Sequence, residues 1–589
     1  MALRPLRQGM LHRVLERLRP FRSKITLGFV IIISNQLLRM ILPLITREVV
    51  NNVIPNRDFH LMLWLGGMLL AISGIRAVLL YNRGMIFERV SQGMIYKLRT
   101  ELYSRLQAQS YTFYDKHRIG EIMSRMTGDM EGLRGFIMNL CLTIFEQSMS
   151  FLGALVFMGA MSWPLTLTVL AICPALAFIA WLFNKKIRPA HAAVREQNAV
   201  LNTRTQENIA GVRVVKAFAR EPYESEQFKT DNQKVLQLNL KATRIWSNFN
   251  PTMDFIGSLA IPFMLLVGSR LVSNGTIDLG TLIAATGYVY MLVNPMRMLA
   301  NFVNIFAQGI TSAEKLFYYL DLGSIVRDPA SPVAPAVSEG RVSFENVTLA
   351  YGDNVVLNDL SFEAEPGQTV AIMGATGSGK TSVINLLGRF YDIRSGSVKV
   401  DGVDVRRQKL ADLRRNIGYV MQESFLFSES IAENIAFGNP GLPREKIEQS
   451  AQIAQASDFI THMPQAWETV VGERGLGLSG GQKQRVSIAR ALACDPKILI
   501  LDDSTSAVDM ETEALIQEGL KRVMGKRTTF VIAHRISSVI HADQILVLDQ
   551  GKLAERGSHA ELMEQKGLYY QMFMDQYRDF ADLGDVKGA

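Results

Sequence analysis

The stretch that decides the fold is a glycine-rich loop, Gly374-Ala375-Thr376-Gly377-Ser378-Gly379-Lys380-Thr381. A short apolar run, Val370-Ala371-Ile372-Met373, leads into it, and the residues after it favour a helix. This order of strand, loop and helix matches the phosphate-loop pattern completely. Because glycines let backbone N–H groups curl around phosphates at a helix N-terminus, we expect a nucleotide site in an α/β domain.

The side chains of this loop suit a nucleotide with its metal ion. Lys380 would reach the β- and γ-phosphates, and the Thr381 hydroxyl would ligate Mg²⁺. Downstream, Ile498-Leu499-Ile500-Leu501-Asp502 reads as a buried strand, and its terminal carboxylate would hold the metal through water. The other expected phosphate contacts are Gly374, Thr376, Gly377, Ser378, Gly379 and Ser382. These features alone also fit helicases, kinases and GTPases.

The composition indicates a membrane part joined to a soluble part. The 589 residues are 48% hydrophobic with a mean hydropathy of +0.12, which is high for a soluble protein, yet 20% are charged. Crossing a bilayer as a helix takes about 20 mostly apolar residues. Six segments meet that need, near Ile25–Ile45, Leu61–Tyr81, Phe136–Met161, Leu165–Phe183, Phe255–Val272 and Thr281–Val303.

The basic N-terminal end predicts the orientation. From Met1 to Lys24 there are seven basic residues and one acidic residue, Glu16. By the positive-inside rule this end stays in the cytoplasm, and an even number of crossings returns the chain there, where ATP is available. Together with the absence of a targeting presequence, this favours a multi-pass protein of a bacterial inner membrane.

Polar and helical features of the membrane part add two expectations. The long links near residues 82–135 and 184–250 have few Gly or Pro and repeat apolar positions three and four apart, which predicts helices reaching into the cytoplasm. Polar side chains within or beside the spans face either a cargo cavity or a partner helix, and both interpretations stay open. They are Asn35, Arg39, Arg76, Glu146 and Asp254.

A proline-rich stretch, Asp328-Pro329-Ala330-Ser331-Pro332-Val333-Ala334-Pro335, marks the domain boundary. We therefore expect a transmembrane domain at 1–320, a linker at 321–339, a nucleotide-binding domain at 340–575 and a tail at 576–589. The three cysteines have no metal-ligand spacing, which argues against a disulfide or zinc framework. The net charge of +8 follows membrane topology, so no nucleic-acid partner is expected.

A second motif, Leu478-Ser479-Gly480-Gly481-Gln482, lies between the phosphate loop and the strand that ends at Asp502. It resembles the signature sequence of ATP-binding cassette (ABC) proteins. The resemblance covers essentially the whole chain and implies half of an exporter. The fold it implies has six long transmembrane helices of the type IV exporter kind, followed by an α/β nucleotide-binding domain. The implied cofactors are ATP and Mg²⁺, and the implied partner is a second ABC half-transporter.

The resemblance also implies roles for single residues. Tyr351 is similar to the aromatic residue that stacks on adenine, and Gln422 to the residue that touches Mg²⁺ and senses the membrane domain. Ser479 and Gly481, flanked by Gly480 and Gln482, would bind the γ-phosphate of ATP held by the opposite subunit. Asp509 would communicate across the dimer, and His534 would contact the γ-phosphate. Phe113–Lys116 and Gln206–Phe218 resemble the two cytoplasmic loop tips that press on nucleotide domains.

One residue departs from the family pattern. Where the family usually has a glutamate that polarises the attacking water, this chain has Asp503. Aspartate is one methylene shorter, which withdraws the carboxylate by about 1.5 Å. A misplacement of about 1 Å can cost on the order of a hundredfold in rate. With an intact signature, this predicts a heterodimer in which the site of Lys380, Asp502 and Asp503 hydrolyses ATP weakly.

The cargo is expected to be a hydrophobic or amphipathic small molecule, drug-like or lipid, in contact with membrane lipid. Three alternatives remain open at this stage. They are a homodimeric lipid flippase, an importer fused like those for siderophores, and a non-transporting cassette ATPase, against which the six apolar spans argue. The roles of Arg39, Arg76, Glu146 and Asp254, the partner and the substrate are not determined by the sequence.

Overall fold

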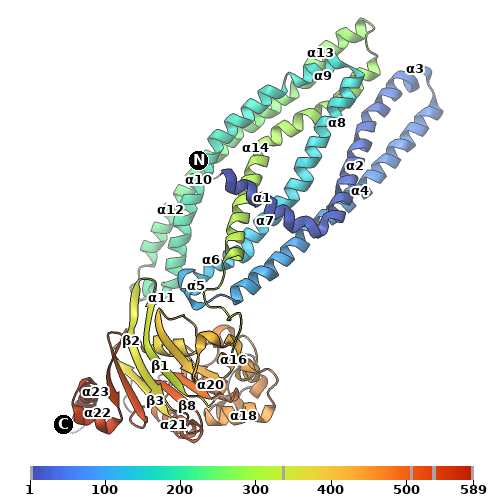
Figure 1. Cartoon of the computed structure of the whole chain (residues 1–589). Coiled ribbons are helices and arrows are strands. Elements are labelled where there is room, and N and C mark those ends of the chain that lie inside the picture. The colour runs from blue at the N-terminus through green and yellow to red at the C-terminus, as the bar shows by residue number, and fades with distance from the viewer. Residues whose placement is uncertain (1–3, 334–338, 505–507, 534–538, 586–589) are drawn as a thin grey trace. The chain divides into compact units, whose positions relative to one another are not determined.

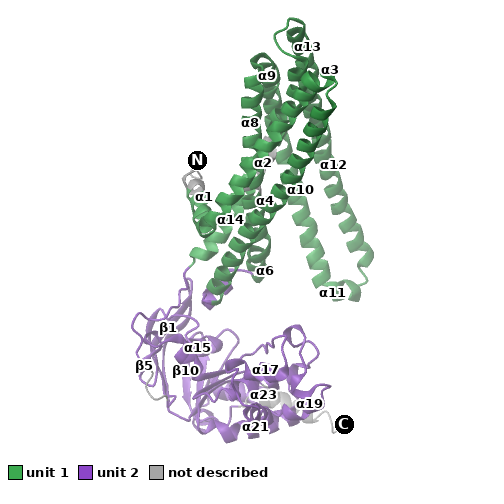
Figure 2. Cartoon of the chain, turned by 90° about the vertical axis from the view of Figure 1, so that its right-hand side faces the viewer, with its two compact units in different colours: residues 1–107, 119–322 green, residues 108–118, 323–589 purple. Residues whose placement is uncertain are grey.

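The computed structural model describes residues 4–333, 339–504, 508–533 and 539–585. The chain divides into two units (Figure 2). The first unit comprises Met1–Gln107 and Ile119–Leu322, and the second comprises Ala108–Arg118 and Gly323–Ala589. The short segment Ala108–Arg118 therefore belongs to the second unit, although the residues on both sides of it belong to the first.

The first unit is built of helices (Figure 1). Six of its helical runs, within the described residues, are long and apolar enough to cross a membrane, as the sequence predicts. The helices are α1 (Arg4–Leu18), α2 (Arg22–Glu48), α3 (Ile54–Asn56), α4 (Phe59–Gln107), α6 (Ile119–Ser124), α7 (Met130–Met138), α8 (Phe145–Met161), α9 (Trp163–Leu170), α10 (Cys173–Ala210), α11 (Val212–Ala217), α12 (Glu221–Ser258), α13 (Ala260–Ser273) and α14 (Leu279–Asp321).

The helices continue well past the apolar segments, as predicted for the two long links. Helix α4 extends to Gln107. Helices α10 and α12 lie side by side, and the short α11 connects them (Figure 1). Hydrocarbon offers no hydrogen-bond partners to the backbone. A helix satisfies its backbone N–H and C=O groups internally, so it can cross the bilayer without leaving them unpaired. Tyr288 of α14 is fully buried, and its hydroxyl donates to the Met40 carbonyl of α2 over 2.5 Å.

The second unit contains two sheets. An antiparallel sheet has the order β2-β1-β4-β5, and a six-stranded sheet has the order β10-β9-β3-β8-β7-β6, with β10 antiparallel to β9 and the remaining neighbours parallel. The strands are β1 (Val342–Tyr351), β2 (Asn354–Ala364), β3 (Thr369–Gly374), β4 (Ser395–Val400), β5 (Val403–Asp404), β6 (Ile417–Val420), β7 (Ile498–Asp502), β8 (Thr528–Ile532), β9 (Gln544–Asp549) and β10 (Lys552–Gly557).

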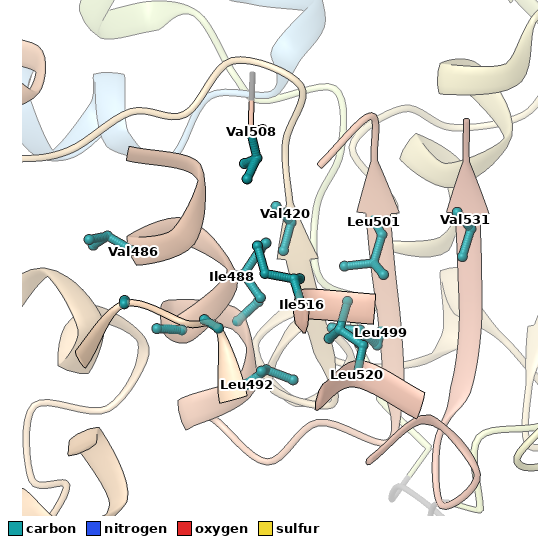
Figure 3. Packing of buried hydrophobic residues seen from close by; sticks show 14 of the residues in the cluster. Val420, Val486, Ile488, Leu492, Leu499, Leu501, Val508, Ile516, Leu520 and Val531 are labelled. Atoms are coloured by element: carbon teal, nitrogen blue, oxygen red, sulfur yellow. The ribbon is translucent and has the colours of Figure 1, made fainter. Parts of the chain in front are cut away.

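Helices cover the six-stranded sheet and close its core. Figure 3 shows Leu499 and Leu501 of β7 packed with Ile488 of α20 and Ile516 of α21. Parallel strands buried on both faces are nearly all apolar, which explains runs such as Ile498–Leu501. The helices of the second unit are α5 (Tyr111–Lys116), α15 (Lys380–Leu387), α16 (Leu410–Arg415), α17 (Ile431–Ile435), α18 (Arg444–Ile453), α19 (Ser457–Thr461), α20 (Gly480–Ala493), α21 (Met510–Met524), α22 (His559–Gln565) and α23 (Leu568–Asp585).

Helix α5 packs on the second unit through aromatic side chains. The Tyr111 ring stacks on the Phe390 ring with 4.5 Å between centroids and 2° between planes. The Tyr391 hydroxyl donates to Oδ2 of Asp115 over 2.9 Å. The resemblance predicts that Phe113–Lys116 presses on a nucleotide domain, and in this unit the segment contacts the nucleotide domain of its own chain.

The segment that follows α14 is also attached to the second unit. The Arg389 guanidinium donates to the Arg327 carbonyl over 3.0 Å, and the Leu410 N–H donates to Oδ1 of Asp328 over 2.7 Å. The Val333 N–H donates to the Arg407 carbonyl over 2.9 Å. The described part of the proline-rich stretch is thus held by hydrogen bonds, although it forms neither helix nor strand.

Candidate nucleotide-binding site

The glycine-rich loop connects β3 to α15 in a conformation that only glycine adopts easily. Gly374, Gly377 and Gly379 have positive φ angles of 143°, 84° and 102°. A Cβ atom on Gly374 would lie 2.2 Å from the Leu548 carbonyl oxygen, so a larger residue would push β9 away. The loop ends directly at the N-terminus of α15. The N–H groups of the first helical turn have no partner within the helix there, and they attract anions.

Lys380 is buried and holds the loop. Its Nζ donates to the Gly374 carbonyl over 2.8 Å and to the Ala375 carbonyl over 2.9 Å. Burial lowers the pKa of the Lys380 ammonium, and the negative charge of Asp502 opposes that shift. A cation held by these carbonyls inside an anion-binding loop is suited to a phosphate group.

Two hydroxyls complete the loop. Ser378 is 4% exposed, and its Oγ has no hydrogen-bond partner among the residues that the structure describes. Thr381 is exposed on the first turn of α15. A buried orphan hydroxyl, a cation and a glycine cradle fit the phosphates of a nucleotide, and the Thr381 hydroxyl fits a hard metal ion.

Tyr351 lies at the end of β1, beside the first turns of α15. Its hydroxyl is 3.1 Å from Oγ of Ser382, and its ring meets the Tyr391 ring edge to face at 4.8 Å. Tyr351 is 37% exposed as a residue, which leaves part of it open to a flat ligand. Burial raises the pKa of the Tyr351 phenol, so the ring is neutral at physiological pH.

The two aspartates that follow β7 differ in their surroundings. Asp502 is 5% exposed and pairs in register with Ile532 of β8. Asp503 has a positive φ of 48°, its N–H donates to the Ile532 carbonyl over 3.0 Å, and its carbonyl accepts from Nε2 of Gln484 at 3.4 Å. The left-handed conformation suits Asp better than most residues. These bonds fix the main chain from which the Asp503 carboxylate projects.

The signature residues cap helix α20. Oγ of Ser479 accepts from the Gln482 N–H over 3.3 Å, and the Ser479 N–H donates to Oε1 of Gln482 over 2.9 Å. This capping box aligns the N-terminus of α20, so that Gly480 and Gly481 begin it without side chains. This N-terminus of α20 is exposed at Ser479 and Gly480. Such exposure is required if it is to contact a ligand bound to another subunit.

The remaining predicted residues are spread around the unit. Gln422 is exposed just after β6. Asp509 caps α21, where its Oδ1 accepts from the Thr512 N–H over 2.9 Å, and hydrogen bonds from Thr512 lower the pKa of the Asp509 carboxyl. His534 lies outside the described residues.

Arg490 of α20 is a residue that the sequence analysis missed. Its guanidinium donates to the Asn434 carbonyl over 2.7 Å, to Oδ1 of Asn434 over 2.8 Å and to the Phe425 carbonyl over 2.8 Å. It thereby joins the signature helix to the segment that follows Gln422. No sequence pattern distinguishes such an arginine from a solvent-exposed one on a helix.

Comparison with known proteins identifies the family. The family described as "ABC transporter transmembrane region" matches residues 25–296, and "ABC transporter" matches residues 357–506. The "ATP-dependent lipid A-core flippase" of Syntrophus aciditrophicus is 32% identical over 97% of this chain and 95% of its own length. The chain is an ABC transporter. Both the predicted family and the predicted fold class are confirmed.

Further comparisons give this ABC transporter its type. The "Putative multidrug export ATP-binding/permease protein YgaD" of Bacillus subtilis is 32% identical over 96% of this chain and 99% of its own. A solved structure titled "Structure of a bacterial Atm1-family ABC exporter with ATP bound" matches with a TM-score of 0.81 and 28% identity, covering 94% of this chain and 98% of that chain. This ABC transporter is thus an exporter-type, multi-pass membrane protein with an ATPase domain.

Proposed function

We propose that this chain is one half of a heterodimeric exporter that moves hydrophobic or amphipathic molecules out of the cytoplasm. Its N-terminus and nucleotide-binding domain lie on the cytoplasmic side of a bacterial inner membrane. Each of two ATP molecules lies between the phosphate loop of one subunit and the signature of the other. ATP binding favours the closed pair, and hydrolysis resets it.

The observation that carries the proposal is the position of Asp503. Its backbone is held by Ile532 and Gln484 in a left-handed conformation. A carboxylate one methylene shorter than glutamate has little freedom to move forward from such a fixed backbone, so water activation is poor at this chain's own phosphate loop. Ser479, in contrast, stands in an intact capping box and can complete the partner's site.

The other site residues would bind and orient ATP and its Mg²⁺ ion. In the proposed mechanism Lys380 leaves its loop carbonyls for the β- and γ-phosphates, while Ser378, Thr376 and the loop glycines surround them. Thr381, Asp502 and Gln422 would hold Mg²⁺, which supplies charge neutralisation at the phosphates when bound. Tyr351 would stack on the adenine, and Asp509 and His534 would act at the dimer interface and the γ-phosphate.

The test is the ATPase activity of the purified full-length chain, alone and with any partner that co-purifies. We expect slow hydrolysis by the chain alone and a gain on the order of a hundredfold in Asp503→Glu. Asp503→Asn is the matched control, because it keeps the length and the left-handed backbone preference but removes the charge. Robust hydrolysis by the unmodified chain alone would refute the weak-site heterodimer.

A homodimeric lipid flippase is a second candidate, supported by the similarity to the Syntrophus aciditrophicus protein over nearly the full length. The two candidates differ in assembly. Mass measurement of the transporter purified from its native host distinguishes them, since a stoichiometric second chain supports the heterodimer and two identical chains support the flippase.

A further inference from the structure

A short stretch after α15, Arg389–Asp392, contacts three parts of the second unit that are far apart in the sequence. We call it the junction segment. It meets α5 and the adenine candidate Tyr351 through aromatic rings, and it holds the chain that follows α14 through a guanidinium group. A segment that contacts both a ligand-binding side chain and the chain connections to the first unit is well placed to relay ligand binding.

The junction segment has a fixed start. Arg389 is buried and has a left-handed backbone with a φ of 46°, which is uncommon for a residue with a long side chain. Its Nε donates to Oδ1 of Asp392 over 2.7 Å, and its Nη1 donates to the Arg327 carbonyl over 3.0 Å. Such backbone conformations persist where surrounding bonds hold them, and they cluster at functional sites. Phe390 and Tyr391 therefore project from a well-held main chain.

Tyr391 has a different contact at each end of its side chain. Its ring meets the Tyr351 ring edge to face, with 4.8 Å between centroids and 67° between planes. Its hydroxyl donates to Oδ2 of Asp115 on α5 over 2.9 Å. Burial and this hydrogen bond both raise the pKa of the Tyr391 hydroxyl, which is therefore protonated and can donate at physiological pH. One side chain thus reaches from the adenine candidate to α5.

Phe390 holds the beginning of α5. Its ring stacks on the Tyr111 ring, and the Arg414 guanidinium lies 4.9 Å from the centroid of the same Phe390 ring. The segment that contains α5, Ala108–Arg118, continues at both ends into the chain of the first unit. How firmly α5 is held therefore affects the two connections to the first unit.

A ligand stacked on Tyr351 would act on Tyr391. Edge-to-face aromatic pairs favour a defined geometry, so fixing one ring restricts the other. With its ring restricted, the Tyr391 hydroxyl stays directed at Asp115, and hydrogen bonds to a carboxylate are among the stronger ones. The base is common to ATP and ADP, so this effect needs no γ-phosphate.

We propose that Tyr391 is a positioning residue through which the base of a bound nucleotide, stacked on Tyr351, tightens the attachment of α5 to the nucleotide domain. The proposal rests on the adenine contact that the proposed function gives to Tyr351, and it adds a signal for occupancy of the site. Helix α5 is then held whenever ATP or ADP fills this site. With weak hydrolysis at this chain's own phosphate loop, α5 stays held while the partner's site turns over.

The test is hydrogen–deuterium exchange of residues 108–118 in the full-length transporter in detergent, with and without saturating ADP and Mg²⁺. The readout is the ratio of the two exchange rates. We expect ADP to slow exchange about fivefold, the scale of one aromatic pair. Tyr391→Phe should abolish this effect while the affinity for ADP stays unchanged. Asp115→Asn keeps an acceptor oxygen and should preserve most of it.

Tyr419→Phe is the matched control. The Tyr419 ring also meets the Phe390 ring edge to face, at 5.6 Å, but its hydroxyl donates to Oδ1 of Asn385 rather than to α5. This variant removes a neighbouring hydroxyl of the same kind, and it should keep the full ratio.

The ratio separates positioning from a merely structural contact. A structural contact would change exchange equally with and without ADP, so an unchanged ratio in Tyr391→Phe would overturn the proposal. No slowing by ADP in the wild type would also overturn it, as would slowing by ATP alone, which would trace the signal to the γ-phosphate. Unchanged ADP affinity in Tyr351→Ala would refute the adenine contact of the proposed function, whereas weaker affinity with an unchanged ratio at saturation would refute only the relay.

Discussion

Nη2 of Arg47, near the end of α2, donates to Oδ2 of Asp278, just before α14, over 2.8 Å. Oδ1 of Asp278 also caps α14 by accepting from the Thr281 N–H over 2.5 Å. Beside this pair, the Gly280 N–H donates to Oδ1 of Asn51 over 2.8 Å. The first and sixth spans are thus joined at the end far from the N-terminus of α2.

Replacing Asp278 should reveal how much this junction stabilises the membrane unit. Asp278→Asn keeps a good helix cap but loses the ion pair, which at this partial exposure contributes about 0.5 kcal/mol. Asp278→Ala also loses the cap, at about 1 kcal/mol more. Thermal unfolding in detergent should therefore rank wild type above Asp278→Asn above Asp278→Ala.

A double variant and a pH series check the cause. If the ion pair causes the difference, Arg47→Gln should produce almost no further loss of stability in the Asp278→Asn background. Although burial raises the pKa of Asp278, the hydrogen bonds from Arg47 and Thr281 outweigh it and leave that pKa below its usual value. The contribution is then complete above the ordinary carboxyl range and lost only as pH falls through the lowered pKa. A gap between wild type and Asp278→Asn that changed from about pH 5 to pH 8 would contradict this.

Tyr351 is expected to contribute through its ring rather than its hydroxyl. Tyr351→Ala should weaken ATP binding about tenfold, the usual scale of stacking on a base, whereas Tyr351→Phe should change it little. Equilibrium binding of a fluorescent ATP analogue measures both. Tyr391→Phe serves as the control, since it removes the bond to Asp115 but keeps the ring that packs against Tyr351. Equal losses in the Phe and Ala variants would show that the hydroxyl bond to Ser382 matters instead.

Ser479 has two separable tasks, capping α20 and facing a phosphate. Ser479→Ala should lose about 1 kcal/mol of capping, whereas Ser479→Asp keeps a cap. In the assembled transporter both should lower ATP hydrolysis by about a hundredfold, because the first removes a donor and the second adds a repelling charge. Thermal unfolding and ATPase rates measured together distinguish the tasks. Normal hydrolysis in Ser479→Asp would remove Ser479 from the phosphate site.

Arg490 should act as a positioning residue. Arg490→Lys cannot make all three bonds to Asn434 and Phe425, and hydrogen bonds to a charged group each contribute about 1.5 to 3 kcal/mol. We expect a clearly lower melting temperature and a larger loss of hydrolysis than of ATP binding. Arg522→Lys, on an exposed pair with Glu518, is the neutral control. A similar small effect in both variants would contradict this role.

The sequence predicted the elements whose signal is local. Apolar runs of about 20 residues and the absence of helix breakers in the links were enough to predict six spans and their helical extensions. The glycine pattern at 374–381 predicted a loop between strand and helix, and positive φ at Gly374 and Gly379 confirms why glycine is needed there.

Other features depend on contacts between residues far apart in the chain. The left-handed backbone of Asp503 follows from β8, which supplies the Ile532 carbonyl, and no local pattern encodes it. Arg490 was missed for the same reason, because its partners lie 56 and 65 residues away. The polar residues of the spans were noticed, yet which of them meet depends on helix packing.

The attachment of Ala108–Arg118 has a practical consequence for anyone dissecting this protein. A soluble fragment cut at Gly323 would leave behind Tyr111 and Asp115, which cover Phe390 and Tyr391. Phe390 and Tyr391 would then form an exposed apolar patch, and we expect such a fragment to self-associate as its concentration rises. Adding a peptide spanning residues 108–118 in trans should restore its solubility, which sedimentation can follow.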